Sequence, residues 1–177
     1  MNKKIDAPET KLIDKIVCHI KTFKNCSLDE KQKILKLLTI GFGPDNDPFL
    51  IDNAVVVMFF YKNYLVGVVS GIDNYYLIKD NINYESNRAS YYINYDKKGV
   101  FIYNLAVLKS CRGNGLGNSL VRVLMNYFKK IGVEYFHVQI NENNEGSNKI
   151  FKGQGFTVRK NLMAEDNNKF NVLTYFV

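Results

Sequence analysis

The chain has 177 residues, of which 46% are hydrophobic, and a formal net charge of +7. That length and composition fit one globular domain over residues 1–177, with enough apolar side chains for a sizeable core. The basic excess would suit a phosphorylated ligand or an acidic partner. No arginine cluster or basic stripe stands out, so we expect no specific nucleic-acid binding.

The amino-terminal stretch, residues 1–10, has no apolar core and is therefore not expected to be a secretory signal. The longest apolar run, residues 54–60, is too short to span a bilayer, so no membrane association is expected. The three cysteines are odd in number and lack paired spacing, which argues against a disulfide framework or a zinc site. These features predict an intracellular, cytoplasmic protein with reduced thiols.

The first elements are predicted as a strand and a helix. Residues 13–23 mix polar and apolar side chains with many β-branched residues, which is typical of a strand. Ser27 lies three residues before Glu30, the spacing of a capping box, so a helix should begin there. Its apolar stripe reaches Phe42, and the two prolines of residues 41–48 should end it.

A hairpin and a long connection should follow. Residues 54–61 and 64–70 are two strand-like runs separated by the two-residue turn Lys62-Asn63. Residues 72–98 are polar and rich in tyrosine, and they are long for a connection between neighbouring strands. We prefer to interpret this segment as a solvated insertion with a short strand extension. The alternative is a lid whose tyrosines contact the substrate.

The most informative stretch begins with a buried strand over residues 100–108. Residues 112–117 then read R-G-N-G-L-G, and three glycines can present bare backbone N–H groups to a ligand. An apolar stripe from Leu116 to Ile131, closed by Gly132, predicts a helix immediately afterwards. A glycine loop at a helix N-terminus is a site for an anion such as phosphate.

The remaining chain alternates strands with one short helix. Residues 134–141 should form a strand and residues 147–153 a helix. Residues 155–160 and 172–177 should form the last two strands, joined by the polar loop of residues 164–170.

Two motifs carry a family resemblance. The loop lacks the G-K-[ST] of a Walker A sequence and the spacing of a dinucleotide fingerprint. Its R-x-x-G-x-G order after the strand L-A-V resembles the acetyl-CoA site of the GNAT superfamily of N-acetyltransferases. The strand His137–Ile140, followed by Asn144, Phe151 and Gly155-Phe156, is similar to the next block of that family. The resemblance covers roughly the whole chain and is most specific over residues 100–158.

The resemblance implies an α/β (α+β) fold, with a mixed central sheet of about seven strands flanked by about four helices. Acetyl-CoA would lie between two splayed parallel strands, with its pantetheine amides on the strand backbone and its pyrophosphate on the glycine loop. The cofactor-binding residues that the resemblance implies are Leu105, Ala106, Val107, Arg112, Gly113, Asn114, Gly115, Leu116, Gly117, Asn118, Asn144 and Phe151.

The acceptor should be a primary amine that attacks the thioester directly, and it must first be neutral. At pH 7, removing the proton costs about 4.6 kcal/mol for a lysine-type amine and about 1.4 kcal/mol for an α-amino group. Residues 100–107 contain no acid, so His137 is the best candidate for the base, with a structural role as the alternative. Its segment is also similar to the L-H-V segment of protein Nα-acetyltransferases. Tyr103 is a second, weaker candidate for proton relay.

Phe151 departs from the family pattern, because a tyrosine that protonates the leaving thiolate is common at this place. A thiol of pKa about 8.5 leaves at pH 7 with a penalty of about 2 kcal/mol, so its loss should slow catalysis rather than abolish it. The leading hypothesis is therefore an N-acetyltransferase that acts on a small amine, a polyamine or a protein amine. The alternative is an acetyl-CoA-binding module with weak or no catalysis. No metal is expected, and the chain could be a monomer or a homodimer.

Overall fold

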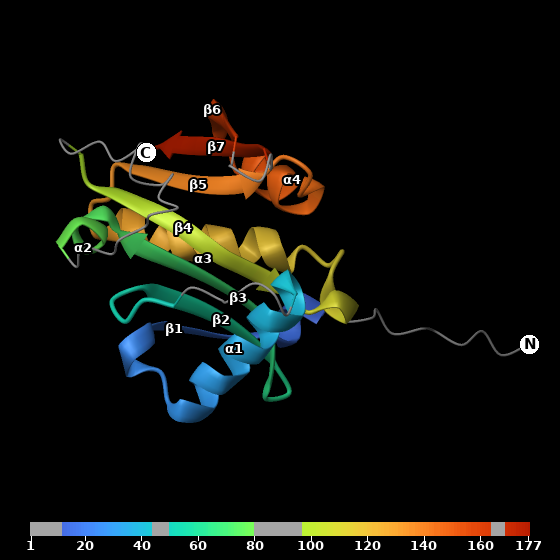
Figure 1. Cartoon of the computed structure of the whole chain (residues 1–177). Coiled ribbons are helices and arrows are strands. Elements are labelled where there is room, and N and C mark those ends of the chain that lie inside the picture. Colours follow the sequence, from blue (N-terminus) through green and yellow to red (C-terminus); the bar gives the residue numbers. More distant parts are fainter. Residues whose placement is uncertain (1–11, 44–49, 80–96, 164–168) are drawn as a thin grey trace, which may run out of the picture.

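The computed structural model describes residues 12–43, 50–79, 97–163 and 169–177. In that part of the chain seven strands form one sheet, in the order β1-β2-β3-β4-β5-β7-β6 (Figure 1). Only β4 and β5 are parallel neighbours there, and the other pairs are antiparallel. The strands are β1 Val17–Thr22, β2 Val55–Tyr61, β3 Tyr64–Asp73, β4 Gly99–Val107, β5 Tyr135–Asn141, β6 Thr157–Met163 and β7 Lys169–Phe176.

Helices cover both faces of the sheet. The described α-helices are α1 Leu28–Phe42, α2 Asn74–Lys79, α3 Leu116–Lys130 and α4 Glu145–Gly153, and short 3-10 helices span Leu12–Lys15, Phe23–Asn25 and Lys109–Cys111. The buried side of α3 packs with inward residues of β2 to β5, and Phe151 of α4 joins the same cluster. The buried side of α1 packs on the opposite face of β2 and β3. The mixed sheet with four helices confirms the predicted fold class.

The capping box at the start of α1 is present as the sequence predicts. The Ser27 side chain accepts a hydrogen bond from the Glu30 N–H at 3.2 Å, and the Glu30 carboxylate accepts one from the Ser27 N–H at 2.8 Å. Lys21 Nζ on β1 also donates to both Glu30 oxygens, at 2.8 and 2.9 Å. Burial raises the pKa of Glu30, but the hydrogen bonds from Lys21 and Ser27 outweigh it and lower that pKa to about 2. The carboxylate thereby joins α1 to the edge of the sheet.

The structure corrects several predicted boundaries. β1 begins at Val17 rather than residue 13, because Leu12–Lys15 form a 3-10 turn. β6 and β7 extend further toward one another than the sequence predicts, so that Lys169 and Phe170 pair with β6 instead of lying in a loop. Residues 164–168 of that predicted loop lie outside the described residues.

The start of the tyrosine-rich connection forms regular structure. β3 continues to Asp73, whose carboxylate accepts a hydrogen bond from the Tyr75 N–H at 2.9 Å, and α2 begins at that point. The sequence analysis missed α2, because its six residues are too few to show a helical period. Residues 80–96, on which the choice between insertion and lid depends, lie outside the described residues. No helix in the described part of the chain is long and apolar enough to cross a membrane.

Candidate functional site

The site begins where the two parallel strands part. β4 and β5 pair only from Gly99 opposite Tyr135 to Ile102 opposite Val138. Directly afterwards β4 contains a bulge, because the step from Val68 to Ser70 on β3 lies opposite the longer step from Tyr103 to Ala106. Asn104, within the bulge, has a φ of 55°, a left-handed conformation that asparagine tolerates better than most residues.

The bulge reverses which side of the sheet each later residue of β4 faces. Val100 and Ile102 pack with α3, and strict alternation would send Ala106 to the same side. Instead Ala106 packs in the α1 cluster, whereas Leu105 and Val107 pack against the α3 cluster. Beyond Ile102, β4 no longer pairs with β5. Among the described residues, the backbone edge of β4 on that side has no strand partner from this point on.

The glycine loop closes one end of this gap. Gly113 and Gly115 have φ values of 82° and 76°, so both use the left-handed region that glycine enters without steric cost. Gly115 is the N-cap of α3 and supplies no side-chain cap. The first N–H groups of α3 therefore have no acceptor within the helix and lie at its positive end. Asn114 braces the loop, because its side-chain amide donates to the carbonyls of Cys111 and Arg112 at 3.3 and 3.2 Å.

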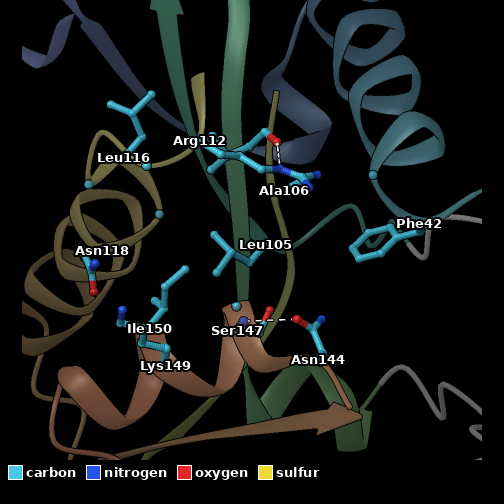
Figure 2. Close-up of a pocket in the computed structure, with 16 residues that line it drawn as sticks. Phe42, Leu105, Ala106, Arg112, Leu116, Asn118, Asn144, Ser147, Lys149 and Ile150 are labelled. Atoms are coloured by element: carbon cyan, nitrogen blue, oxygen red, sulfur yellow. Dashed lines mark hydrogen bonds between the residues drawn. The ribbon is translucent and has the colours of Figure 1, made fainter. Parts of the chain in front are cut away.

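A cleft of about 520 Å³ lies beside the open end of β4, between the glycine loop and the start of α4 (Figure 2). Arg112 and Lys149 are the charged residues that line it, and both are cationic. Arg112 Nε donates to the Val107 carbonyl at 3.0 Å, which fixes this guanidinium at the end of β4 and uses one of its five N–H donors. The full lining is Gly41, Phe42, Leu105, Ala106, Val107, Arg112, Gly113, Gly115, Leu116, Gly117, Asn118, Asn144, Gly146, Ser147, Lys149 and Ile150.

The second wall of the cleft is the start of α4. Asn144 is the N-cap of this helix, and its Oδ1 accepts a hydrogen bond from the Ser147 N–H at 3.1 Å. α4 also contacts the start of α3, since a Cβ on Gly117 would lie 2.6 Å from Ile150 Cδ1. Most of the residues predicted to bind the cofactor are thus brought to one cleft. Asn114 and Phe151 are the two that are not among its lining residues.

Phe151 is placed in the core instead. Its side chain is 1% exposed and makes an edge-to-face contact with Phe156, with ring centroids 5.1 Å apart. The apolar stripe of a short helix explains this position, because residue 151 faces the sheet while Ile150, the residue before it, lines the cleft.

His137 lies outside the cleft lining and is 1% exposed. Its Nε2 lies 3.0 Å from Oδ1 of Asn74, whose Nδ2 donates to the Tyr135 hydroxyl at 2.6 Å. Since Asn74 Oδ1 can only accept, His137 Nε2 carries the proton in this hydrogen bond. Burial lowers the pKa of His137 to about 3. The environment of this ring is that of a structural histidine.

Tyr103 lies next to this cluster rather than in the cleft lining. Its ring stacks on Phe101, with centroids 5.8 Å apart and an interplanar angle of 10°. Tyr103 is half-buried and packs against a small cluster of Ile51, Ala54, Ile72 and Phe101.

The sequence analysis missed six lining residues of the cleft. Two come from the end of α1, and four come from one face of α4. Helical spacing from Asn144 leads to Ser147, Asn148 and Phe151. Of these only Ser147 lines the cleft, so the sequence contains no such signal for the other three α4 residues. The six are Gly41, Phe42, Gly146, Ser147, Lys149 and Ile150.

Comparisons with known proteins agree with this geometry. The sequence profile of the acetyltransferase (GNAT) family matches residues 40–156, more than half of the chain, and the protein therefore belongs to this family. No curated protein matches the sequence.

The fold is similar to that of several solved structures. In the NatC complex bound to Gag peptide and CoA, one chain matches with a TM-score of 0.69 at 14% identity, over 92% of this chain and 99% of that chain. Naa50 of Arabidopsis thaliana, in complex with the bisubstrate analogue CoA-Ac-MVNAL, matches with a TM-score of 0.63 at 15% identity, over 90% and 99%. An acyl-CoA N-acyltransferase from Pseudomonas aeruginosa matches with a TM-score of 0.64 at 15% identity, over 90% and 98%. At such identities the likeness concerns the fold.

Proposed function

We propose that this protein is an acetyl-CoA-dependent N-acetyltransferase that moves the acetyl group to a primary amine by direct attack on the thioester. The observation that carries the proposal is the cleft itself. It lies where β4 and β5 part, it ends at the glycine loop and the N-terminus of α3, and its charged lining residues are both cationic. That combination suits a long ligand with an extended amide-containing arm and a phosphate end.

The lining residues offer groups that suit each part of the acyl donor. The backbone edge of Leu105–Val107 can form strand-like hydrogen bonds with the pantetheine amides. The N–H groups of residues 113–117 can bind the pyrophosphate, aided by the helix dipole and by the remaining donors of Arg112. A backbone N–H of β4 in this region can also stabilise the charge that develops on the thioester carbonyl.

The acceptor is most readily an α-amino group. Deprotonating it at pH 7 costs about 1.4 kcal/mol, against about 4.6 kcal/mol for a lysine-type amine. With a pKa of about 3, His137 is a poor proton acceptor, so the proposal assigns it no proton transfer. Two of the similar structures hold peptides or peptide analogues, which supports a peptide amino terminus as one acceptor class to test. Tyr103 remains a candidate for proton relay.

A second candidate is an acetyl-CoA-binding module with little catalysis. Phe151 favours this alternative, because its ring lies in the core and offers no hydroxyl to a leaving thiolate. The two candidates differ in turnover rather than in affinity, and both require that the chain bind CoA.

The test is a paired measurement of binding and turnover. Calorimetry with CoA should show association of the purified chain. Thioester consumption with acetyl-CoA should then rise on adding peptides with free amino termini, and rise less with blocked peptides that offer only a lysine side chain. Binding without turnover on any amine would leave the binding module. No association with CoA would overturn both candidates.

A further inference from the structure

The cleft extends from one face of the sheet to the other. α3 and α1 pack on opposite faces of the sheet, and the residues that line the cleft come from both helices. Leu116 lies at the start of α3, and Phe42 lies at the end of α1. Figure 2 shows these two residues on opposite sides of Leu105. The cleft therefore has one end at the glycine loop and another at the end of α1.

The end of α1 is held close to β4 by two small residues. A Cβ on Gly41 would lie 3.3 Å from the Ala106 Cβ, which is closer than side chains normally approach one another. α1 ends at Phe42, because Gly43 follows with a φ of 92° and its N–H donates to the Thr39 carbonyl at 2.9 Å. The backbone thus fixes the place of Phe42 at this end of the cleft.

The surroundings of Phe42 differ from those of the glycine loop. Among the described residues that line the cleft, Phe42 is the one with an aromatic side chain, and it is 38% exposed. Gly41 and Ala106, which line the cleft beside it, are small and uncharged, whereas the two cations of the lining come from the glycine loop and from α4. An exposed aromatic ring in such a place gains free energy when it packs against an apolar group.

We propose that Phe42 packs against the first side chain of the acceptor, and that the acceptor is a peptide amino terminus whose first residue is apolar. This inference rests on the proposed function. With the pyrophosphate at the glycine loop, the thioester of the donor lies toward the α1 end of the cleft. The attacking α-amino nitrogen has to reach the thioester carbon, and the side chain of the same residue begins only two bonds away from that nitrogen. Phe42 would therefore select the first residue of the peptide.

The experiment measures how peptides bind to the protein saturated with CoA. CoA carries no acetyl group, so the complex cannot turn over and calorimetry reports affinity alone. The probes are pentapeptides that differ only in a first residue of leucine, methionine, serine or glycine. The leucine and methionine peptides should bind about tenfold more tightly than the glycine peptide, because their side chains bury apolar surface. The serine peptide should resemble the glycine peptide.

Two residues of α1 provide the matched variants. Phe42→Ala should weaken binding of the leucine peptide about tenfold and that of the glycine peptide less than twofold. Phe42→Leu should retain most of the preference. Leu35→Ala removes an apolar side chain of the same helix that is 41% exposed and is not among the lining residues, so it should leave the preference unchanged. CoA affinity should change less than twofold in every variant, which also shows that each variant is folded.

The outcomes separate this inference from the proposed function. Equal affinities for the leucine and glycine peptides, or an equal loss of both in Phe42→Ala, would overturn the inference while CoA binding and turnover leave the proposed function intact. A loss of CoA affinity as large as the loss of peptide affinity in Phe42→Ala would place the ring against the donor and would also overturn it. Absence of CoA binding by the unaltered chain would overturn the proposed function and this inference with it.

Discussion

The two halves of β4 differ in how they pair with the neighbouring strands. From Gly99 to Ile102 the strand is buried and pairs with β3 and β5 on both edges. From Tyr103 to Val107 it bulges, reverses its alternation and loses β5 as a neighbour. The first half holds β4 and β5 together, and the second half lines the cleft that we propose as the binding site.

The paired half contains a polar cluster that has no counterpart in the open half. Asn74 at the start of α2 bonds both Tyr135 and His137 on β5, so its side chain reaches across β4. It crosses at Gly99, where a Cβ would overlap the Tyr135 ring and lie 2.6 Å from Asn74 Nδ2. A buried and closely packed polar cluster thus lies next to the place where β4 and β5 part.

The largest effect is expected at this crossing. Gly99→Ala should lower the free energy of unfolding by about 3 kcal/mol, because the added methyl group has to displace Tyr135 or Asn74 from a packed cluster. Urea unfolding measures the change. Gly153→Ala is the matched control, since nothing lies within 4 Å of a Cβ at that position. Equal stability of the two variants would mean that the cluster is not packed across β4 in this way.

The same cluster should make stability depend on pH. The folded pKa of His137, about 3, lies below the ordinary histidine value of 6.5, so the unfolded chain binds the extra proton between these two values. The free energy of unfolding should therefore be unaffected above pH 6.5 and fall by about 2 kcal/mol between pH 7 and pH 5. Glu30 acts in a lower window, because its pKa falls from 4.5 to about 2 and its contribution is lost only below pH 4.5.

A substitution of His137 separates its contribution to the pH dependence of stability from that of the other titratable groups. His137→Gln cannot gain a charge, so the decline between pH 7 and pH 5 should become nearly flat, whatever the absolute stability of the variant. Urea unfolding at four or five pH values gives the slope. An unchanged slope would assign the acid sensitivity to other groups and would mean that His137 titrates with an ordinary pKa.

The two halves of β4 also differ in how far the sequence predicts them. The open half is signalled by local features, because Gly113 and Gly115 follow a buried strand and precede an apolar helical stripe. Such signals need no knowledge of distant residues, and the cleft lining contains most of the residues predicted from them.

The paired half depends on contacts between distant residues, which local patterns do not contain. Asn74 and His137 are 63 positions apart, and α2 is too short to be recognised from its period. In the sequence, a histidine within an apolar strand gives the same pattern whether it lines a functional site or forms a hydrogen bond with a buried amide side chain. The same limit applies to α4. Phe151 lies in the core and Lys149, two residues earlier, lines the cleft, and the local sequence does not distinguish the two positions.

A third prediction concerns the open half. Gly115→Ala should weaken CoA binding about tenfold, because residue 115 has a φ of 76° and the loop must rearrange its N–H groups to accept a Cβ. Gly132→Ala is the control, since Gly132 has a φ of 80° at the other end of α3 and also has no atom within 4 Å of a Cβ. Both variants should lose about 1 kcal/mol of stability. Similar CoA affinities for the two would deny the loop its role in binding.

The smallest effect tests the charge of the cleft. Asn144→Asp keeps the N-cap of α4, because aspartate accepts the same hydrogen bond, so stability should stay within about 0.5 kcal/mol. The added negative charge lies among lining residues whose charges are both positive, and it should lower CoA affinity about threefold at low salt. Asn143→Asp makes the same change one residue away, outside the cleft lining, and should leave the affinity nearly unchanged. If both substitutions weakened CoA binding alike, the preference for an anionic ligand would come from the positive charge of the whole protein surface. An electrostatic field set by the cleft walls must instead distinguish the two residues, because Asn144 lines the cleft and Asn143 does not.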